Sequence, residues 1–249
     1  MPLRFFKSLR GLPAFLGDWV KFRKIYQGRM NFTPCLYDRF EEGGTTKNEY
    51  FWQDLIVARW IYEAGPIKHV DVGSRVDGFV AHVASFRQIE VLDIRPNTSQ
   101  IPGITFKQAD LMSTKTISAL TELGGYCDSI SCLHVLEHFG LGRYGDKIDP
   151  LGYAKGLRNL SELLKHGGRL YLSTPMGRQR VEFNANWVFA PQTIFNLAKL
   201  NGLLPQRFLV FNSKSGLEEI PIYALENTIV ELEKNDYQLG IIEFIKQNE

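Results

Sequence analysis

Two histidines and a glutamate stand close together in the run His134-Val135-Leu136-Glu137-His138. Positions i, i+3 and i+4 share one face of a helical turn, so we expect the three polar side chains to point into the same crevice. Imidazole titrates near neutral pH, and a positioned histidine can remove a proton from a hydroxyl nucleophile. The run therefore predicts a catalytic set of His134, Glu137 and His138 that acts on an acceptor. The alternative is structural: Glu137 and His138 bond to neighbouring loops and hold the crevice together.

A glycine turn at residues 69–78 predicts a ligand site. An apolar strand reaches Asp71, the chain turns through Gly73 and Gly78, and a helix is expected to begin at Phe79. At the carboxyl edge of a parallel sheet, such a turn lets the backbone approach a ligand closely. The spacing is not the G-x-G-x-x-G of dinucleotide-binding folds, and no lysine follows to form a phosphate loop. The turn fits a ligand without a pyrophosphate.

Two further acidic residues end the next strands along the chain. Asp93 follows Val91-Leu92 twenty residues past Gly73, where a carboxylate can accept hydrogen bonds from two ribose hydroxyls. Asp110 ends the third strand, where it can accept a hydrogen bond from an adenine amino group. Strand-ending acids in this order predict one crevice that binds a cofactor. The predicted cofactor contacts are Asp71, Gly73, Ser74, Gly78, Asp93, Asp110 and Leu133.

A glycine-rich loop from Gly140 to Asp149 follows the histidine run. A flexible segment beside the crevice suits an acceptor clamp or lid, so Arg143, Tyr144 and Asp146 are predicted to bind the substrate. An ordinary surface loop ahead of the next helix is the alternative. Residues ahead of the first strand are candidates for closing over the cofactor, with core packing as the alternative: Tyr50, Gln53 and Asp54.

Short apolar runs alternate with helical patterns from about residue 50 onward, which is typical of a parallel sheet covered on both faces. Strands are predicted at about 67–72, 88–93, 103–108, 127–133, 168–174, 207–212 and 239–245. Helices are predicted at 51–64, at 79–86, from Leu151 to the Gly167-Gly168 turn, and from Pro191 to Asn201-Gly202. Residues 214–237 are ambiguous. We expect an α/β, Rossmann-like fold with a seven-stranded, mostly parallel sheet and helices on both faces.

The net charge of +2 is distributed unevenly along the 249 residues. Residues 1–30 hold seven basic residues and one acid, a balance of +6, so residues 31–249 sum to −4. Aromatic residues alternate with these basic residues, which suits peripheral contact with an anionic membrane. The alternative is an amphipathic helix packed on its own domain. We expect a basic, amphipathic N-terminal extension at 1–45 and a cofactor-binding domain at 46–249.

The bulk composition limits the class of protein. With 44% hydrophobic and 22% charged residues, the chain is typical of a globular protein that needs no disulfide or metal for stability. Three scattered cysteines indicate a reducing, cytoplasmic compartment. No apolar run approaches the length that spans a bilayer.

The acidic strand ends and the glycine turn resemble those of the class I, S-adenosylmethionine-dependent methyltransferases. The resemblance covers residues 67 to about 175 and includes the Gly167-Gly168-Arg169-Leu170 entry to the fifth strand. It implies S-adenosyl-L-methionine as the cofactor and a Rossmann-like class I methyltransferase fold. Most of residues 32–175 also resemble an uncharacterised family associated with surface-polysaccharide biosynthesis, which implies a glycan or lipid-linked sugar acceptor. The runs that carry this narrower resemblance are Tyr50 to Leu55, His69 to Arg75 and Gly140 to Asp146.

The histidine run is also similar to the E-x-x-E-H run of ubiquinone-pathway O-methyltransferases and small-RNA 2′-hydroxyl methyltransferases. In those families the run holds a divalent metal. Here His134 replaces the first glutamate, and an imidazole favours a softer ion than magnesium. A metal stays an alternative at this run, and we assign none.

Together these features predict methyl transfer from S-adenosylmethionine to oxygen, on a sugar of a surface glycan or its precursor. The run Ser131-Cys132-Leu133-His134 lacks the Asn/Asp-Pro-Pro-Tyr motif of amino-nitrogen methylation, which favours oxygen. One alternative acceptor is an RNA 2′-hydroxyl or a small metabolite, but no nucleic-acid partner is expected, because no basic patch is evident beyond the N-terminal segment. The other alternative is a non-catalytic, membrane-peripheral scaffold that binds the cofactor. The expected location is the cytoplasm, including the inner face of the membrane.

Overall fold

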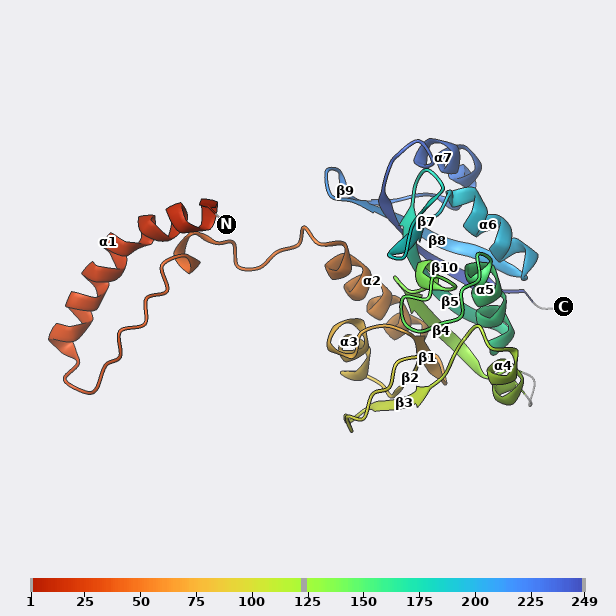
Figure 1. Cartoon of the computed structure of the whole chain (residues 1–249), viewed down its shortest axis with the longest axis horizontal. Coiled ribbons are helices and arrows are strands. Elements are labelled where there is room, and N and C mark those ends of the chain that lie inside the picture. Colours follow the sequence, from red (N-terminus) through yellow and green to blue (C-terminus); the bar gives the residue numbers. More distant parts are fainter. Residues whose placement is uncertain (1, 122–124, 248–249) are drawn as a thin grey trace. The chain divides into compact units, whose positions relative to one another are not determined.

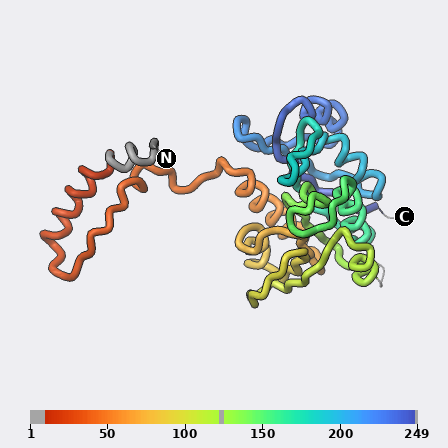
Figure 2. The backbone as a smooth tube through the Cα atoms, viewed as in Figure 1, coloured from red at the N-terminus to blue at the C-terminus, as the bar shows by residue number. Residues whose placement is uncertain are grey.

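A computed structural model describes residues 2–121 and 125–247, and the chain divides into two units, Met1–Thr46 and Lys47–Glu249. In the first unit, α1 (Pro2–Ile25) is one continuous helix with Pro13 inside it. The chain then returns without regular structure to a short turn of 3-10 helix, η1 (Asp38–Phe40) (Figure 2). None of the helices in the described residues combines the length and the hydropathy needed to cross a bilayer.

The described part of the second unit forms an eight-stranded sheet in the order β3-β2-β1-β4-β5-β10-β8-β9 (Figure 1). The five strands β1 to β5 run parallel, whereas β10 is antiparallel to both of its neighbours. This confirms the Rossmann-like, mostly parallel fold expected from the sequence. The strands are β1 (His69–Val72), β2 (Ile89–Asp93), β3 (Ile104–Gln108), β4 (Cys127–Leu133), β5 (Leu164–Met176), β8 (Leu203–Asn212), β9 (Gly216–Glu219) and β10 (Gln238–Lys246).

Helices cover both faces of the sheet (Figure 1). The core on one face includes α2 and α3, and the core on the other includes α4, α5, α6 and α7. Successive residues of a strand point to opposite faces, so Leu170 and Leu172 of β5 join one core and Tyr171 joins the other. The helices are α2 (Glu49–Ala64), α3 (Ala81–Ala84), α4 (Thr114–Thr121), α5 (Gly152–Leu163), α6 (Pro191–Leu200) and α7 (Leu225–Leu232).

The sheet has one strand more than the seven expected. The additional strand is β9, which lies inside the ambiguous segment 214–237 and forms a hairpin with β8. The rest of that segment includes a 3-10 turn, η4 (Ile222–Ala224), and α7. A second, two-stranded sheet was also not expected: β6 (Arg180–Glu182) pairs with β7 (Asn186–Val188). These short strands lack the length on which an alternating pattern can be recognised.

Two helix boundaries differ from the prediction. The helix that was expected to reach Gly167-Gly168 ends at Leu163, because Leu164 already pairs with Cys127 as part of β5. The helix expected at 79–86 begins earlier, as a π-helical turn, η2 (Val76–Val80), that leads into α3. The N-terminus of α2 is capped by Asn48, whose side chain accepts a hydrogen bond from the Tyr50 N–H at 2.9 Å.

Candidate active site

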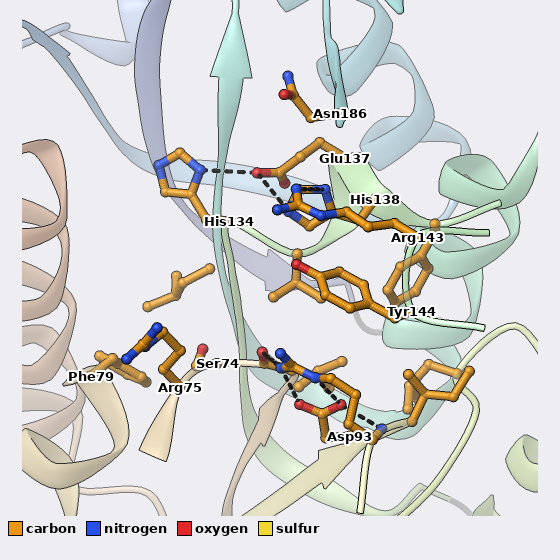
Figure 3. Close-up of a pocket in the computed structure, with 18 of the residues that line it drawn as sticks. Ser74, Arg75, Phe79, Asp93, His134, Glu137, His138, Arg143, Tyr144 and Asn186 are labelled. Carbon is orange, nitrogen blue, oxygen red and sulfur yellow. Dashed lines mark hydrogen bonds and ion pairs between the residues drawn. The ribbon is translucent and has the colours of Figure 1, made fainter. Parts of the chain in front are cut away.

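A cavity of about 680 Å³ opens where β1, β2, β3 and β4 end (Figure 3). Its volume lies in the range typical of small-molecule sites. The strand registers, such as Val72 opposite Leu92, bring the turns after these strands together. The cavity is lined by most of the predicted site residues: Gly73, Ser74, Gly78, Asp93, Asp110, Leu133, His134, Glu137, His138, Arg143, Tyr144 and Asp146.

Asp71 is the predicted cofactor contact that does not line this cavity. It is fully buried beneath the glycine turn, where its carboxylate accepts hydrogen bonds from the Ser74 N–H (3.0 Å), the Ser74 hydroxyl (2.9 Å) and the Ser131 hydroxyl (2.6 Å). Burial raises the pKa of Asp71 to about 7, although these hydrogen bonds favour the charged form. The expectation of direct contact is therefore corrected: Asp71 holds the turn in place and does not face the ligand space.

Gly73 gives the turn its shape. Its φ of 72° lies in the left-handed region, and a Cβ at this position would stand 2.6 Å from Val135 Cγ1. The Gly73 N–H donates to the Leu92 carbonyl at 2.9 Å, which ties the turn after β1 to β2. A glycine is thus required here both for the backbone conformation and for the close approach of Val135.

Asp93 stands at the end of β2 and carries an unexpected partner. Arg95 donates to both oxygens of the Asp93 carboxylate, from Nε at 3.0 Å and from an Nη nitrogen at 2.6 Å. The same guanidinium reaches the Gly73 carbonyl at 3.2 Å. The guanidinium of Arg95 therefore occupies both oxygens of the carboxylate that the sequence assigns to the ribose, Asp93 (Figure 3).

Asp110 and Leu133 complete this part of the wall. Asp110 Oδ1 accepts the Met112 N–H at 2.8 Å, which fixes the turn after β3. Leu133 ends β4 and is buried. Among the predicted cofactor contacts, Asp93 and Asp110 are thus the carboxylates that reach the cavity.

His134 is buried between two carboxylates. Its Nδ1 lies 2.9 Å from Glu137 Oε1 and its Nε2 lies 3.7 Å from Glu49 Oε1. Burial alone would lower the pKa of His134, but the hydrogen bond to Glu137 and the charges of Glu137, Glu49 and Asp54 raise it above its ordinary value. These interactions shift His134 toward its protonated form, so it is less suited to accept a proton than a histidine with an ordinary pKa.

The geometry of the histidine run differs from the expected helical turn. His134 has a φ of 54°, and it is the one non-glycine residue with a positive φ among those that the structure describes. A 3-10 turn, η3 (Leu136–His138), begins only after it. The three polar side chains are brought together as expected, but His134 approaches Glu137 from outside the turn.

His138 has the opposite character to His134. Its Nδ1 lies 2.7 Å from the Ala185 carbonyl oxygen, in the turn between β6 and β7. A carbonyl oxygen only accepts, so Nδ1 carries the proton and Nε2 is the acceptor of the neutral ring. That Nε2 lies 4.0 Å from Glu137 Oε1. Burial lowers the pKa of His138, and the nearby charges of Arg143 and His134 act in the same direction. The ring is neutral near pH 7 and is able to accept a proton.

The glycine-rich loop is held by one of its own carboxylates. Asp146 accepts the backbone N–H groups of Gly140 (2.9 Å), Gly142 (3.1 Å) and Tyr144 (3.2 Å). The Asp149 N–H also donates to the Gly140 carbonyl at 2.9 Å. Asp146 lines the cavity and, through these bonds, also orders the loop.

Tyr144 and Arg143 project from this loop beside His138 (Figure 3). The Tyr144 ring has two guanidinium groups against it, Arg95 at 4.8 Å and Arg143 at 5.2 Å from its centroid. It also meets the His138 ring edge-on at 5.5 Å. Arg143 donates to the Ala185 carbonyl at 2.9 Å, the same oxygen that orients His138. Both residues remain positioned to contact a ligand.

Several lining residues were not expected from the sequence. Arg95 stands two residues past a strand-ending acid, and this spacing is the one local signal that could have indicated it. Glu49 and Tyr237 are joined by a hydrogen bond of 2.9 Å across 188 residues, for which the sequence holds no signal. Three residues of α2 that were candidates for closing over the cofactor also line the cavity: Tyr50, Gln53 and Asp54.

A metal site is not evident in the part of the chain that the structure describes. No group of three or more His, Cys, Asp and Glu side chains there has an arrangement that could hold an ion. Nδ1 of His134 lies 2.9 Å from Glu137 Oε1, within hydrogen-bond distance, and Nε2 of His138 lies 4.0 Å from the same oxygen, beyond that distance. The run is therefore arranged around a carboxylate oxygen.

Solved structures share this fold over most of both chains. The N-methyltransferase NodS from Bradyrhizobium japonicum WM9, in complex with S-adenosyl-L-homocysteine, has 12% identity and a TM-score of 0.53, covering 82% of this chain and 90% of that one. Burkholderia thailandensis 1,6-didemethyltoxoflavin-N1-methyltransferase has 13% identity and a TM-score of 0.52, covering 100% and 91%. Geranyl diphosphate methyltransferase in complex with S-adenosylmethionine has 11% identity and a TM-score of 0.50, covering 82% and 93%. The chain has the fold of the class I methyltransferases.

Comparison with protein sequences gives less information about this chain than comparison with solved structures. A family model described as a Caenorhabditis protein of unknown function, DUF268, matches residues 81–200, just under half of the chain. The matched range lies further along the chain than the 32–175 expected for the narrower resemblance, and it carries no reaction to transfer. No curated protein matches the sequence.

Proposed function

We propose that this protein is an S-adenosylmethionine-dependent methyltransferase that methylates an oxygen of a sugar, in a surface glycan or its lipid-linked precursor. The unit Lys47–Glu249 contains every residue used in this proposal, and we take 46–249 as the catalytic domain. The fold supports methyl transfer in general, because proteins with varied acceptors share it. The proposal that the acceptor atom is an oxygen, and that it belongs to a sugar, is argued from the geometry of the cavity.

The residues at the ends of β1, β2 and β3 fit the cofactor. The Gly73 turn lines the cavity, Asp93 offers a carboxylate to the ribose hydroxyls, and Asp110 lies just past the end of the next strand. We call this region the cofactor half of the cavity. When bound, S-adenosylmethionine supplies an electrophilic methyl group.

The opposite region, the acceptor half, contains the base. The hydrogen bond from His138 Nδ1 to the Ala185 carbonyl carries the proposal, because it leaves the unprotonated Nε2 free to take a proton from an attacking hydroxyl. Glu137 and His134 act as positioning residues: the buried Glu137 carboxylate lies between the two rings and stabilises the His138 imidazolium that forms. Sugar hydroxyls are weak nucleophiles and benefit from such a base.

The side chains around His138 suit a polyhydroxylated acceptor. Tyr50 and Tyr144 provide aromatic faces, and Asn186 and Arg143 provide hydrogen-bond donors. Such a combination of ring faces and polar groups recognises sugars better than it recognises an apolar substrate. These residues support a glycan acceptor.

The test is a transfer assay with the full chain and methyl-labelled S-adenosylmethionine. Surface glycans, isolated from cells with and without the active protein, are examined by mass spectrometry for the gain of one methyl group. Label on a hydroxyl of a glycan sugar supports the proposal. Label on a nitrogen or on RNA contradicts the acceptor, and cofactor binding without any turnover favours the non-catalytic scaffold.

Replacing Asp93 with alanine is expected to weaken S-adenosylmethionine binding by about 1.5–3 kcal/mol, the range for losing hydrogen bonds to a charged group. Isothermal titration calorimetry measures the loss. The matched control is Asp77→Ala, which removes an exposed carboxylate that is paired with Arg75 at the rim of the same cavity. Unchanged affinity in Asp93→Ala contradicts the ribose assignment.

Replacing Arg95 is expected to change the cofactor affinity in the opposite direction. Because a ribose must displace its guanidinium from Asp93, Arg95→Met should strengthen cofactor binding about two- to fivefold, the equivalent of a partly exposed ion pair of up to about 1 kcal/mol. The same calorimetric titration measures it. Weaker binding in Arg95→Met would mean that Arg95 itself contacts the cofactor.

A further inference from the structure

The first unit has a helical face that the other described residues of the same unit leave uncovered. Residues 27–37 return along one side of α1 (Figure 2), where Phe32 meets Phe15 at 5.1 Å and Trp19 at 6.0 Å between ring centroids. Gly11 permits this close packing, because a Cβ there would overlap the Leu36 carbonyl. Phe15 and Trp19, four residues apart, mark the covered face of the helix.

Apolar side chains gather on the rest of the helix and at its end. Leu16 and Val20 are also four residues apart, so they share a face of their own, and both are exposed. Beyond them, four more apolar or aromatic side chains are exposed, with Ile25 at 84%: Phe22, Ile25, Tyr26 and Phe32. We call residues 16–32 the hairpin tip. A cluster of this kind in water marks an interaction surface.

The same tip is strongly basic. Lys21, Arg23, Lys24 and Arg29 are all exposed, and the sequence from Trp19 to Tyr37 contains no acidic residue. The one acid within the tip, Asp18, is paired with Arg39 at 2.5 Å. The tip therefore presents apolar and positive groups together, and its single carboxylate is already paired with a cation from outside the tip.

We propose that the hairpin tip docks on the surface of an anionic lipid bilayer, with its apolar side chains at the acyl boundary and its basic side chains among the headgroups. This surface satisfies both features at once, because interfacial segments gain from apolar burial and from attraction to anionic lipid. A nucleic acid would use the charges and leave Leu16, Val20 and Ile25 in water. A second copy of the chain would bring two basic tips together against their repulsion. The proposal does not depend on the methyl-transfer reaction.

The experiment is co-sedimentation of the full chain with vesicles of phosphatidylcholine mixed with phosphatidylglycerol, compared with phosphatidylcholine alone. We expect retention on the anionic vesicles, and release as added salt screens the charges. Lys21→Gln combined with Lys24→Gln should weaken retention about fivefold per charge, roughly 25-fold in all. Ile25→Ser should weaken it about tenfold.

Matched controls lie in the second unit. Ile67 is 95% exposed, so Ile67→Ser removes a comparable apolar side chain, and Lys214→Gln removes an exposed charge. Both should leave retention unchanged, and circular dichroism should show every variant to be folded.

The proposal is overturned if the full chain is not retained on anionic vesicles, or if the controls weaken retention as much as the tip variants do. It is also overturned if poly-uridylate binds more tightly than the vesicles and Ile25→Ser has no effect, or if the tip variants only abolish a dimer seen by light scattering.

Discussion

Replacing His138 with alanine is expected to lower methyl-transfer turnover by roughly 10²–10⁴-fold, the usual contribution of a general base. Affinity for S-adenosylmethionine should be unchanged, because His138 lies in the acceptor half of the cavity. Turnover is measured with saturating cofactor and acceptor, and affinity by calorimetry. His166→Ala is the matched control, since His166 also places Nδ1 against a backbone carbonyl, that of Gln247 at 2.9 Å, but does not line the cavity.

The pH dependence distinguishes the two histidines of the run. A base acts in its unprotonated form, and burial lowers the pKa of His138 below its ordinary value of 6.5. Turnover should therefore rise with pH through an ionisation below 6.5, be complete above it, and fall on acidification. A rise centred above 6.5 would instead point to His134, whose pKa is raised. Chelators should leave the rate unchanged; inhibition that is reversed by added divalent ion would establish the metal alternative.

Gly140→Ala is expected to destabilise the protein by about 2–5 kcal/mol. Gly140 has a φ of 83°, which is strained for alanine by about 1–2 kcal/mol, and its added Cβ would overlap the Asp149 carbonyl oxygen. Relieving such an overlap costs roughly 1–3 kcal/mol more. The free energy of unfolding in urea measures the sum. Turnover should fall as well, because Gly140 donates to the Asp146 carboxylate that orders the loop.

Gly145→Ala separates the two contributions. Gly145 lies in the same loop with a φ of 85°, but a Cβ there would meet no atom of the described residues within 4 Å. Only the conformational strain remains, so this variant should lose about 1–2 kcal/mol. Equal losses in the two variants would show that the approach of Asp149 to Gly140 contributes nothing to stability.

The positions of the strands along the chain and the acids at their ends could be predicted because both depend on local sequence. A buried strand is a short apolar run, and an acid at its carboxyl end marks the edge of the sheet. The same rule could not separate Asp71 from Asp93. Both follow apolar residues, but Asp71 meets Ser131 from β4, sixty residues away, and is sealed beneath the turn. Which acid reaches a ligand is decided by such long-range packing.

The roles within the histidine run illustrate a second limit. Its spacing correctly indicated that His134, Glu137 and His138 would lie together. The raised pKa of His134 depends in part on Glu49 at the start of α2, and the tautomer of His138 depends on the Ala185 carbonyl after β6. Neither residue is near the run in sequence. Similarly, the role of Asp146 in ordering the loop could not be predicted from its residue type, because its three backbone donors are visible only in the folded loop.

The position of Tyr144 has a thermodynamic consequence. Its ring contacts Arg95, which bridges Asp93 in the cofactor half, and also Arg143 and His138 in the acceptor half. A ribose that displaces Arg95 alters the cation against that ring, so occupancy of one half changes the free energy of filling the other. By linkage the effect is reciprocal: whatever factor cofactor applies to acceptor affinity, acceptor applies to cofactor affinity. The cofactor and the acceptor would then not bind independently, with Tyr144 as the coupling element.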